Sequence, residues 1–206
     1  MRTVPDDIAR KLMAGADRLT VGFEDVRMDD LAQASGIPRA TLYYHFPSRQ
    51  DVLTFLYDTM LSEYRRTVRD DGMGTARERL TRVLDRLLDQ VTSHPGTAQI
   101  TVANLGELGK LTEMATIDGD PLIREIEGIL QDGVDSGEVR AIEVGPTAIV
   151  MSTLANTVVT RALVAGELEQ RRGISEWLVG LMFDGVATPG PVVELVDPSG
   201  VVDVTG

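Results

Sequence analysis

The sequence predicts an all-α protein, in which a small N-terminal unit of three helices precedes a larger helical domain. Apolar residues recur at spacings of three and four along most of the chain, which is the pattern of helices that bury one face. No convincing run of alternating polar and apolar residues occurs before residue 190. A chain of 206 residues with 43% hydrophobic and 25% charged residues has the size and composition of an ordinary globular protein with this organisation.

Three short helices are expected within the first fifty residues. Gly36 separates the second from the third, because glycine permits the backbone of a tight turn. A longer fourth helix should begin at Ser48, since Ser48 and Asp51 form the Ser-x-x-Asp pattern of a capping box. The expected ranges are 8 to about 19, 28 to 35, 38 to 45 and 48 to about 68.

Five further helices are expected beyond the turn signal at 70–74. Apolar residues between Leu80 and Val91 form the cleanest amphipathic stripe of the chain. Asp120 is expected to cap a helix that has Pro121 at its first position. The helices should begin near residues 77, 95 and 121 and span about 146–165 and 174–186; we expect the tail at 189–206 to be disordered or a short extended arm.

The residue inventory argues against an enzyme. The chain has no cysteine and only two histidines, and it lacks a Gly-rich phosphate loop followed by lysine, so we expect no metal site and no cofactor. Acids stand where a secretory signal would have its apolar core, which predicts a cytoplasmic protein. The uncharged run at 144–160 is shorter than the ~20 apolar residues that a bilayer requires, and it predicts a buried helix and no membrane association.

Residues 27–46 have the pattern of a helix-turn-helix. Leu31 and Ile37 are expected to face the core, and Leu42 and Phe46 to anchor the second helix. The rest of that helix carries groups that can bond phosphates and base edges. On periodicity alone, a surface helix and a DNA-reading helix are equally consistent with this pattern. The outward residues are Arg39, Ala40, Thr41, Tyr43, Tyr44 and His45.

The acidic total does not exclude an anionic partner. Residues 1–70 hold ten of the 20 basic and eleven of the 32 acidic residues, so nearly all of the net charge of -12 belongs to the remainder of the chain. Because salt screens exposed charges beyond about 10 Å, a local surface near the N-terminus can still bind phosphate.

The stretch MDDLAQASGIPRATLYYHFPSRQDVL closely resembles the DNA-binding domain of TetR-like (TetR/AcrR) transcriptional regulators, strongly from Met28 onward and more weakly from residue 8. The resemblance implies a DNA-binding domain at 1–50 and a regulatory domain at 51–188. It also implies a homodimer that binds a double-stranded, palindromic DNA operator as a repressor and is released by an unknown small-molecule effector. The sequence departs from the family pattern at Thr20, Arg27 and Pro38. The departures at Arg27 and Pro38 leave open a helical sensor or protein-interaction module that has lost operator binding.

The resemblance assigns DNA contacts to matching positions. Arg39 and Ala40 correspond to base readers, and Arg49 to a phosphate contact at the start of the fourth helix. Ser48 is expected to help hold the same phosphate, and Arg27 to reach another. For His45, a partly buried histidine is the alternative. The remaining expected DNA contacts are Thr41, Tyr43 and Tyr44.

The regulatory domain should contain the pocket and the dimer interface. The expected pocket lining is Tyr57, Met60, Tyr64, Leu84, Leu88, Asn104, Leu105 and Leu108, residues that any helical core also needs. The last two helices should form the dimer interface, through Met151, Asn156, Val159, Trp177 and Leu181. Thr153, Asn156, Thr157 and Thr160 form a polar strip on the first of these helices; we expect the threonines to bond to their own helix and Asn156 to bond across the dimer, with a ligand-contacting strip as the alternative.

Overall fold

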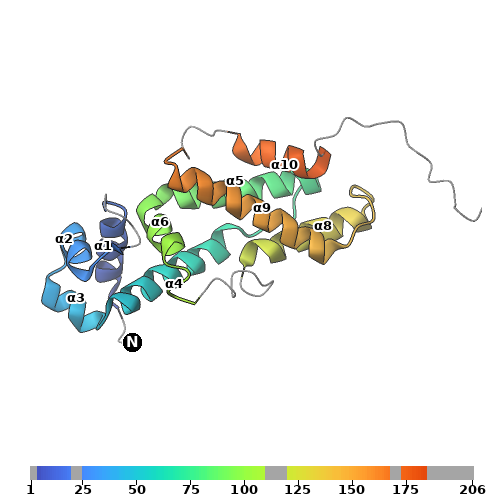
Figure 1. The fold of residues 1–206 in the computed structure, drawn as a ribbon. Helices are drawn as coiled ribbons and strands as arrows, with labels where there is room; N and C mark the ends of the chain where they lie inside the picture. Colours follow the sequence, from blue (N-terminus) through green and yellow to red (C-terminus); the bar gives the residue numbers. More distant parts are fainter. Residues whose placement is uncertain (1–3, 20–24, 110–119, 168–172, 185–206) are drawn as a thin grey trace, which may run out of the picture.

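The structure is a computed structural model that describes residues 4–19, 25–109, 120–167 and 173–184 (Figure 1). These residues form helices and no strand, so the all-α prediction is confirmed. The predicted tail and Thr20 lie outside the described residues. The helices are α1 (Asp6–Ala16), α2 (Met28–Ser35), α3 (Arg39–His45), α4 (Arg49–Thr67), α5 (Ala76–Ser93), α6 (Pro95–Ala103), α8 (Pro121–Asp135), α9 (Val144–Val164) and α10 (Ile174–Asp184).

Two of the predicted helix starts are confirmed in atomic detail. The Ser48 Oγ accepts a hydrogen bond from the Asp51 amide at 3.2 Å, while the Ser48 amide donates to Asp51 Oδ2 at 2.9 Å, and α4 begins behind this box. Asp120 Oδ1 accepts from the Leu122 amide at 2.9 Å, with Pro121 at the first position of α8. In both cases a side chain satisfies a backbone donor that has no partner inside the helix.

α2 begins without a capping side chain of the usual kind. Arg27 occupies the N-cap position, and arginine has no acceptor to offer. Asp30 compensates, because its Oδ2 accepts from the Arg27 amide at 3.0 Å. The residue that compensates for the missing Ser or Thr cap therefore lies inside the helix, three residues later.

The first three helices enclose one hydrophobic cluster. Leu12 of α1 and Leu31 of α2 are fully buried in it. Gly36 turns the chain between α2 and α3 with φ of 68°, a left-handed conformation that favours glycine. α1 and α2 cross closely at Gly15, where an added Cβ would lie 2.6 Å from the Ser35 Cα.

A second hydrophobic cluster fills the larger part of the molecule, among α4, α5, α8, α9 and α10. α4 belongs to both clusters: Leu53 and Leu56 are buried in the first, and Tyr57 and Leu61 in the second. Figure 1 shows α4 leading from the α1–α3 end into the larger part. Any movement of this helix relative to the larger part therefore also moves the end of the molecule that carries α3.

α9 is, by length and composition alone, apolar enough to cross a membrane, with a mean hydropathy of 1.4 in its most apolar window. The core helix of a globular protein satisfies the same criterion. One side of α9 packs on α8 and contributes Ala148, Met151 and Ala155 to the core. The other side remains on the surface, where Val150 is 66% and Val164 70% exposed.

Candidate nucleic-acid interface and ligand cavity

α3 presents an aromatic and polar face to solvent at one end of the molecule (Figure 1). Leu42 and Phe46 are fully buried beneath the helix, and their packing fixes its rotation. The opposite side exposes Tyr43 at 40% and Tyr44 at 59%, with Ala40 exposed one turn earlier. A face with phenolic hydroxyls on it and small Ala40 near the helix start can approach a DNA groove closely.

The arginines beside this face make only exposed contacts. Arg39 forms an ion pair with Asp29 at 3.0 Å, and its guanidinium lies over the Tyr43 ring at 5.5 Å from the centroid. The Arg27 side chain is 82% exposed and lies 3.6 Å from Asp30. Exposed ion pairs contribute little free energy, so both guanidinium groups can exchange these partners for a phosphate.

His45 does not face outward as the sequence suggested. It is 9% exposed, and its ring lies edge-on to Tyr44 with the centroids 5.0 Å apart. The reason is helical geometry: His45 follows Leu42 by three residues and so lies on the same, inward side. The buried Nδ1 has no hydrogen-bond partner among the described residues. Thr41 is half-buried, so Tyr43 and Tyr44 carry the exposed surface of the second half of α3.

Arg49 is engaged within the chain. Its Nε donates to the Val26 carbonyl at 2.6 Å, Nη1 to both carboxylate oxygens of Glu107 at 2.6 Å, and Nη2 to Asn104 Oδ1 at 2.8 Å. Arg49 thus links the segment before α2 to the end of α6. A phosphate contact by Arg49 would have to compete with these bonds. The same holds for Ser48, whose hydroxyl is bonded to Asp51 in the capping box.

A cavity of about 530 Å³ is lined from α4, α5, α6, α8 and α9, with Met13 of α1 also at its wall. This volume falls in the range of about 300–1,000 Å³ that is usual for small-molecule sites. Most of the lining is apolar and includes Met60, Leu87, Val91, Val102, Leu105 and Ile123.

Half of the expected lining residues border this cavity, namely Tyr57, Met60, Tyr64 and Leu105. Leu84 is instead buried in the core, Leu88 and Leu108 pack against the core, and Asn104 bonds Arg49. α5 turns the neighbouring row of Leu87, Gln90 and Val91 towards the cavity. The amphipathic stripe showed which side of α5 is inward, but not which inward row borders empty space.

A buried carboxylate marks the polar wall of the cavity. Asp120 is 2% exposed and accepts hydrogen bonds from Ser152 Oγ, from Asn156 Nδ2 at 2.9 Å and from the Tyr64 hydroxyl at 3.5 Å. Burial, and then the negative charge of Asp120, raise the pKa of Tyr64 well above its ordinary value. The phenol therefore stays protonated and serves as a donor.

The polar strip of α9 faces this cavity. Thr153, Asn156, Thr157 and Thr160 all line it. Thr153 bonds to its own helix, with Oγ1 donating to the Ile149 carbonyl at 2.7 Å, as expected for the threonines. Asn156 was expected to bond across a dimer, but its side-chain amide instead donates to Asp120 of the same chain.

Most of the residues expected at a dimer interface are not well exposed. Met151 and Val159 are each 6% exposed, the first in the core and the second also beside the cavity. Leu181 is half-buried, whereas Trp177 of α10 is 56% exposed. Exposed apolar side chains on α9 that the sequence did not single out are Ile149, Val150 and Val164.

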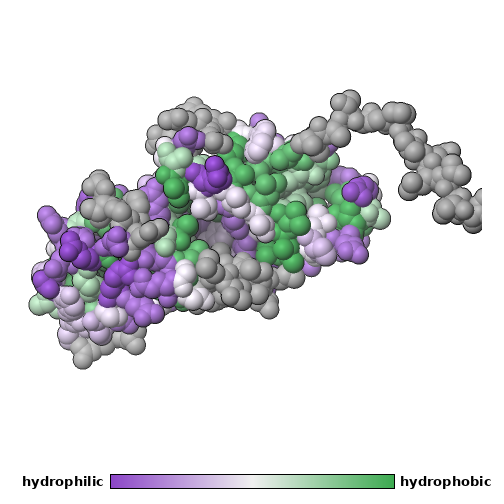
Figure 2. All heavy atoms as spheres, in the orientation of Figure 1, coloured by the Kyte–Doolittle hydropathy of each residue, from purple (hydrophilic) through white to green (hydrophobic). Residues whose placement is uncertain are grey.

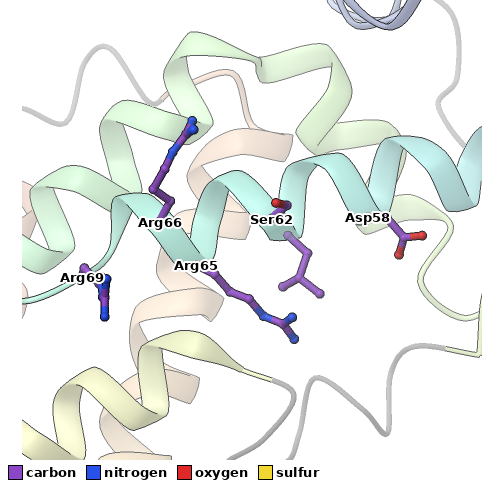
Figure 3. A pocket seen from close by; sticks show the side chains of 6 residues that line it. Asp58, Ser62, Arg65, Arg66 and Arg69 are labelled. Atoms are coloured by element: carbon purple, nitrogen blue, oxygen red, sulfur yellow. The ribbon is translucent and has the colours of Figure 1, made fainter. Parts of the chain in front are cut away.

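Arginines also line a shallow groove on the outer side of α4. Asp58, Ser62, Arg65, Arg66 and Arg69 border it, all from this one helix and the residues just after it. In Figure 3, Arg65 and Arg66 leave α4 in different directions, and the three guanidinium groups do not converge on one point. The groove therefore lacks the geometry of a preformed anion site.

Together these features define the class of fold: a helix-turn-helix unit joined to a larger helical part that carries a cavity. Residues 8–54 of the chain match the family model described as bacterial regulatory proteins, tetR family. The match spans the three helices of the first cluster and the start of α4.

Curated relatives share part of this sequence. The HTH-type transcriptional regulator EthR of Mycolicibacterium smegmatis is 33% identical over 104 residues, which is 46% of either chain. The fatty acid metabolism regulator protein of Bacillus subtilis is 23% identical over 126 residues, 58% of this chain and 63% of its own. The matches thus span less than two thirds of either relative.

Solved structures share the fold over most of the chain. The TetR family regulator PfmR from Thermus thermophilus has a TM-score of 0.70 with 20% identity, covering 87% of this chain and 100% of its own. FadR from Bacillus subtilis, solved in complex with stearoyl-CoA, has a TM-score of 0.65 with 19% identity, covering 86% and 99%. At this identity the likeness establishes the fold.

Proposed function

We propose that this protein is a ligand-responsive transcriptional repressor that binds operator DNA through α3, in the cytoplasm. The observation that carries the proposal is the exposed face of α3, where Arg39, Tyr43 and Tyr44 stand opposite the fully buried Leu42 and Phe46. The match of residues 8–54 to a family of regulators supports it. Regulators of this family are not enzymes, in agreement with the absence of a catalytic motif from the sequence.

DNA binding is tested by fluorescence anisotropy with duplexes from the region upstream of the gene, at low and at moderate salt. Tyr43→Ala should weaken the specific complex by about tenfold or more without changing the unfolding curve in urea. Met73→Ala serves as the control, since Met73 is 71% exposed on the link between α4 and α5, far from α3. If wild-type protein formed no specific complex at low salt, the protein would instead be a helical sensor or interaction module.

The proposed effector is a largely apolar small molecule that binds in the cavity. The apolar lining from α4, α5, α6 and α8 supports this class of ligand. The fold likeness to a FadR structure that contains stearoyl-CoA is consistent with a long aliphatic portion.

α6 is the element through which we propose that the cavity acts on the DNA-binding end. Three of its residues, Ala98, Thr101 and Val102, line the cavity. At the start of α6 the Thr97 amide donates to Asp17 Oδ1 at 2.9 Å, just after α1. Beyond its other end Glu107 pairs with Arg49. A ligand that displaces α6 would thus pull on α1 and α4 together, and it acts only to the extent that it prefers the DNA-incompetent arrangement.

We further propose that the protein binds DNA as a homodimer through α9 and α10. Figure 2 shows apolar side chains gathered over the part of the molecule where these helices lie. Val150, Val164 and Trp177 are the most exposed apolar residues there, and a two-fold partner would cover them. The two copies of α3 would then have to lie about 34 Å apart to reach successive major grooves of a palindromic operator.

A further inference from the structure

Asn156 is held in one orientation at the polar wall of the cavity. Its Nδ2 donates to Asp120 Oδ2 at 2.9 Å and to Ser152 Oγ at 3.3 Å. A carboxylate can only accept, so the amide nitrogen and not the oxygen must face Asp120. The Asn156 Oδ1 is left as an acceptor, and no described residue donates to it.

Gln90 presents a second fixed acceptor. Its Nε2 donates to the Met60 carbonyl at 3.1 Å, which orients the side-chain amide. The Gln90 Oε1 is buried in the cavity lining and has no hydrogen-bond partner among the described residues. A buried acceptor without a donor is unfavourable, so a ligand that brings a donor to this oxygen gains more than one that does not.

The charges at the cavity repel anions. The lining contains the carboxylates of Asp120 and Glu63, and no Lys or Arg occurs among its described residues. His94 lies at the same cavity with its Nδ1 2.8 Å from Asp17 Oδ2. Because the carboxylate accepts, the His94 Nδ1 carries the hydrogen of this bond.

We propose that the effector ends in a hydrogen-bond donor, such as a hydroxyl, a primary amide or an ammonium group, which binds Asn156 Oδ1 and Gln90 Oε1, and that the cavity disfavours carboxylates. This inference rests on the proposed function, because it concerns the polar end of the effector bound in that cavity. The apolar residues hold the aliphatic portion, and the acceptors select its head. The hydroxyls of Thr157 and Thr160 can adapt to either kind of head group, so the selection comes from the fixed acceptors.

The test compares ligands of twelve carbons each that differ in the head group. Dodecanol and dodecanamide carry donors, methyl undecanoate carries only acceptors, and dodecanoate carries a negative charge. Each is titrated into the full-length protein by calorimetry, below its solubility limit and, for dodecanoate, below its critical micelle concentration. Dodecanol and dodecanamide should bind about tenfold or more tightly than methyl undecanoate, with dodecanoate weakest.

A pair of glutamine variants identifies the acceptor. Gln90→Met removes the buried oxygen while keeping the length of the side chain, so it should reduce the preference for dodecanol over the ester to less than about threefold while the ester still binds. Gln131→Met is the matched control: Gln131 is exposed on α8 outside the cavity lining, and its replacement should leave the preference intact.

Three results would overturn the inference: dodecanoate binding as tightly as dodecanol, an unchanged preference in Gln90→Met, or binding of none of the four ligands. These titrations contain no DNA. Their failure is therefore distinguishable from a failure of the proposed DNA binding, which is measured separately with Tyr43→Ala.

Discussion

Arg49 illustrates how a single side chain can connect two parts of a molecule. Its guanidinium holds the Val26 carbonyl on one side, and Asn104 with Glu107 on the other. The Arg49 side chain is 25% exposed, so this ion pair is better shielded from water than most surface pairs. The resemblance to a known family suggested a phosphate contact here, and the structure adds an internal role that no sequence pattern announces.

Glu107→Gln should loosen this link. We expect a decrease of about 0.5–1 kcal/mol in the free energy of unfolding. Relative to wild type, hydrogen exchange should accelerate more for the amides of α2 and α3 than for those of α8. Both are measured on the free protein, by urea unfolding and by exchange followed with mass spectrometry.

Asp184→Asn is the control for this variant, because it breaks the exposed pair between Arg77 and Asp184, remote from α3. Equal exchange of α2 and α3 amides in wild type and Glu107→Gln would contradict a role for Arg49 in the coupling of the two parts.

Asp71 allows a prediction about pH. Hydrogen bonds from Arg82, the Met73 amide and Arg86 lower the pKa of Asp71 to about 2. Its stabilising contribution is present above the pKa of the unfolded chain, near 4, and is lost as the pH falls through about 2. Asp71→Asn should therefore be less stable than wild type at pH 7, and the difference should shrink between pH 4 and pH 2.

The measurement is urea unfolding of both proteins across this range of pH. Asp58→Asn provides the comparison, since Asp58 is exposed on α4 without a hydrogen bond to a described residue. If the difference in the free energy of unfolding between Asp71→Asn and wild type stayed constant down to pH 2, the ionised Asp71 carboxylate would not be the cause of that difference.

At the scale of elements, the crossing of α1 and α2 depends on the absence of one side chain. A Cβ at Gly15 would lie 2.6–2.7 Å from backbone and side-chain atoms of Ser35, closer than packed atoms can approach. Gly15→Ala should therefore lower the free energy of unfolding by about 1–3 kcal/mol, although alanine has the higher helix propensity.

Gly128→Ala is the matched variant in α8, where an added Cβ meets nothing within 4 Å. Here the propensity should dominate, and the same substitution should raise the free energy of unfolding by about 0.5–1 kcal/mol. Thermal and urea unfolding distinguish the two. Equal effects of both substitutions would mean that the close approach at Ser35 relaxes without cost.

Helix boundaries were predictable because their causes are local. The capping box of Ser48 and Asp51, and the pair Asp120 and Pro121, act through residues within one turn, so the sequence alone specifies them. The start of α2 was less predictable, because Arg27 at the N-cap position has no acceptor to offer. The structure shows that Asp30 accepts from the Arg27 amide.

At the scale of the whole molecule, the exposed apolar residues of α9 and α10 predict association. Wild-type protein should sediment as a dimer at micromolar concentration, and Val150→Asp together with Trp177→Glu should shift it to a monomer. Burial of a charge without a partner across an interface is strongly unfavourable. The double variant should also lose most of its affinity for a palindromic operator.

Met73→Lys is the control for this experiment, because it places a charge at an equally exposed apolar residue outside the proposed interface. A wild-type monomer, or a double variant that remained a dimer, would refute association through this surface.

The sequence by itself determined the all-α fold and most of the helix ends, since these depend on periodicity and caps, and it supplied the motif on which the proposal of a DNA-reading helix rests. Only the tertiary structure decided that Arg49 pairs with Glu107 and that Asn156 faces Asp120. Both outcomes depend on which helix packs against which, and on the rotation of each helix about its axis. Periodicity shows which side of a helix is buried, whereas the neighbour that buries it is a property of the assembled molecule.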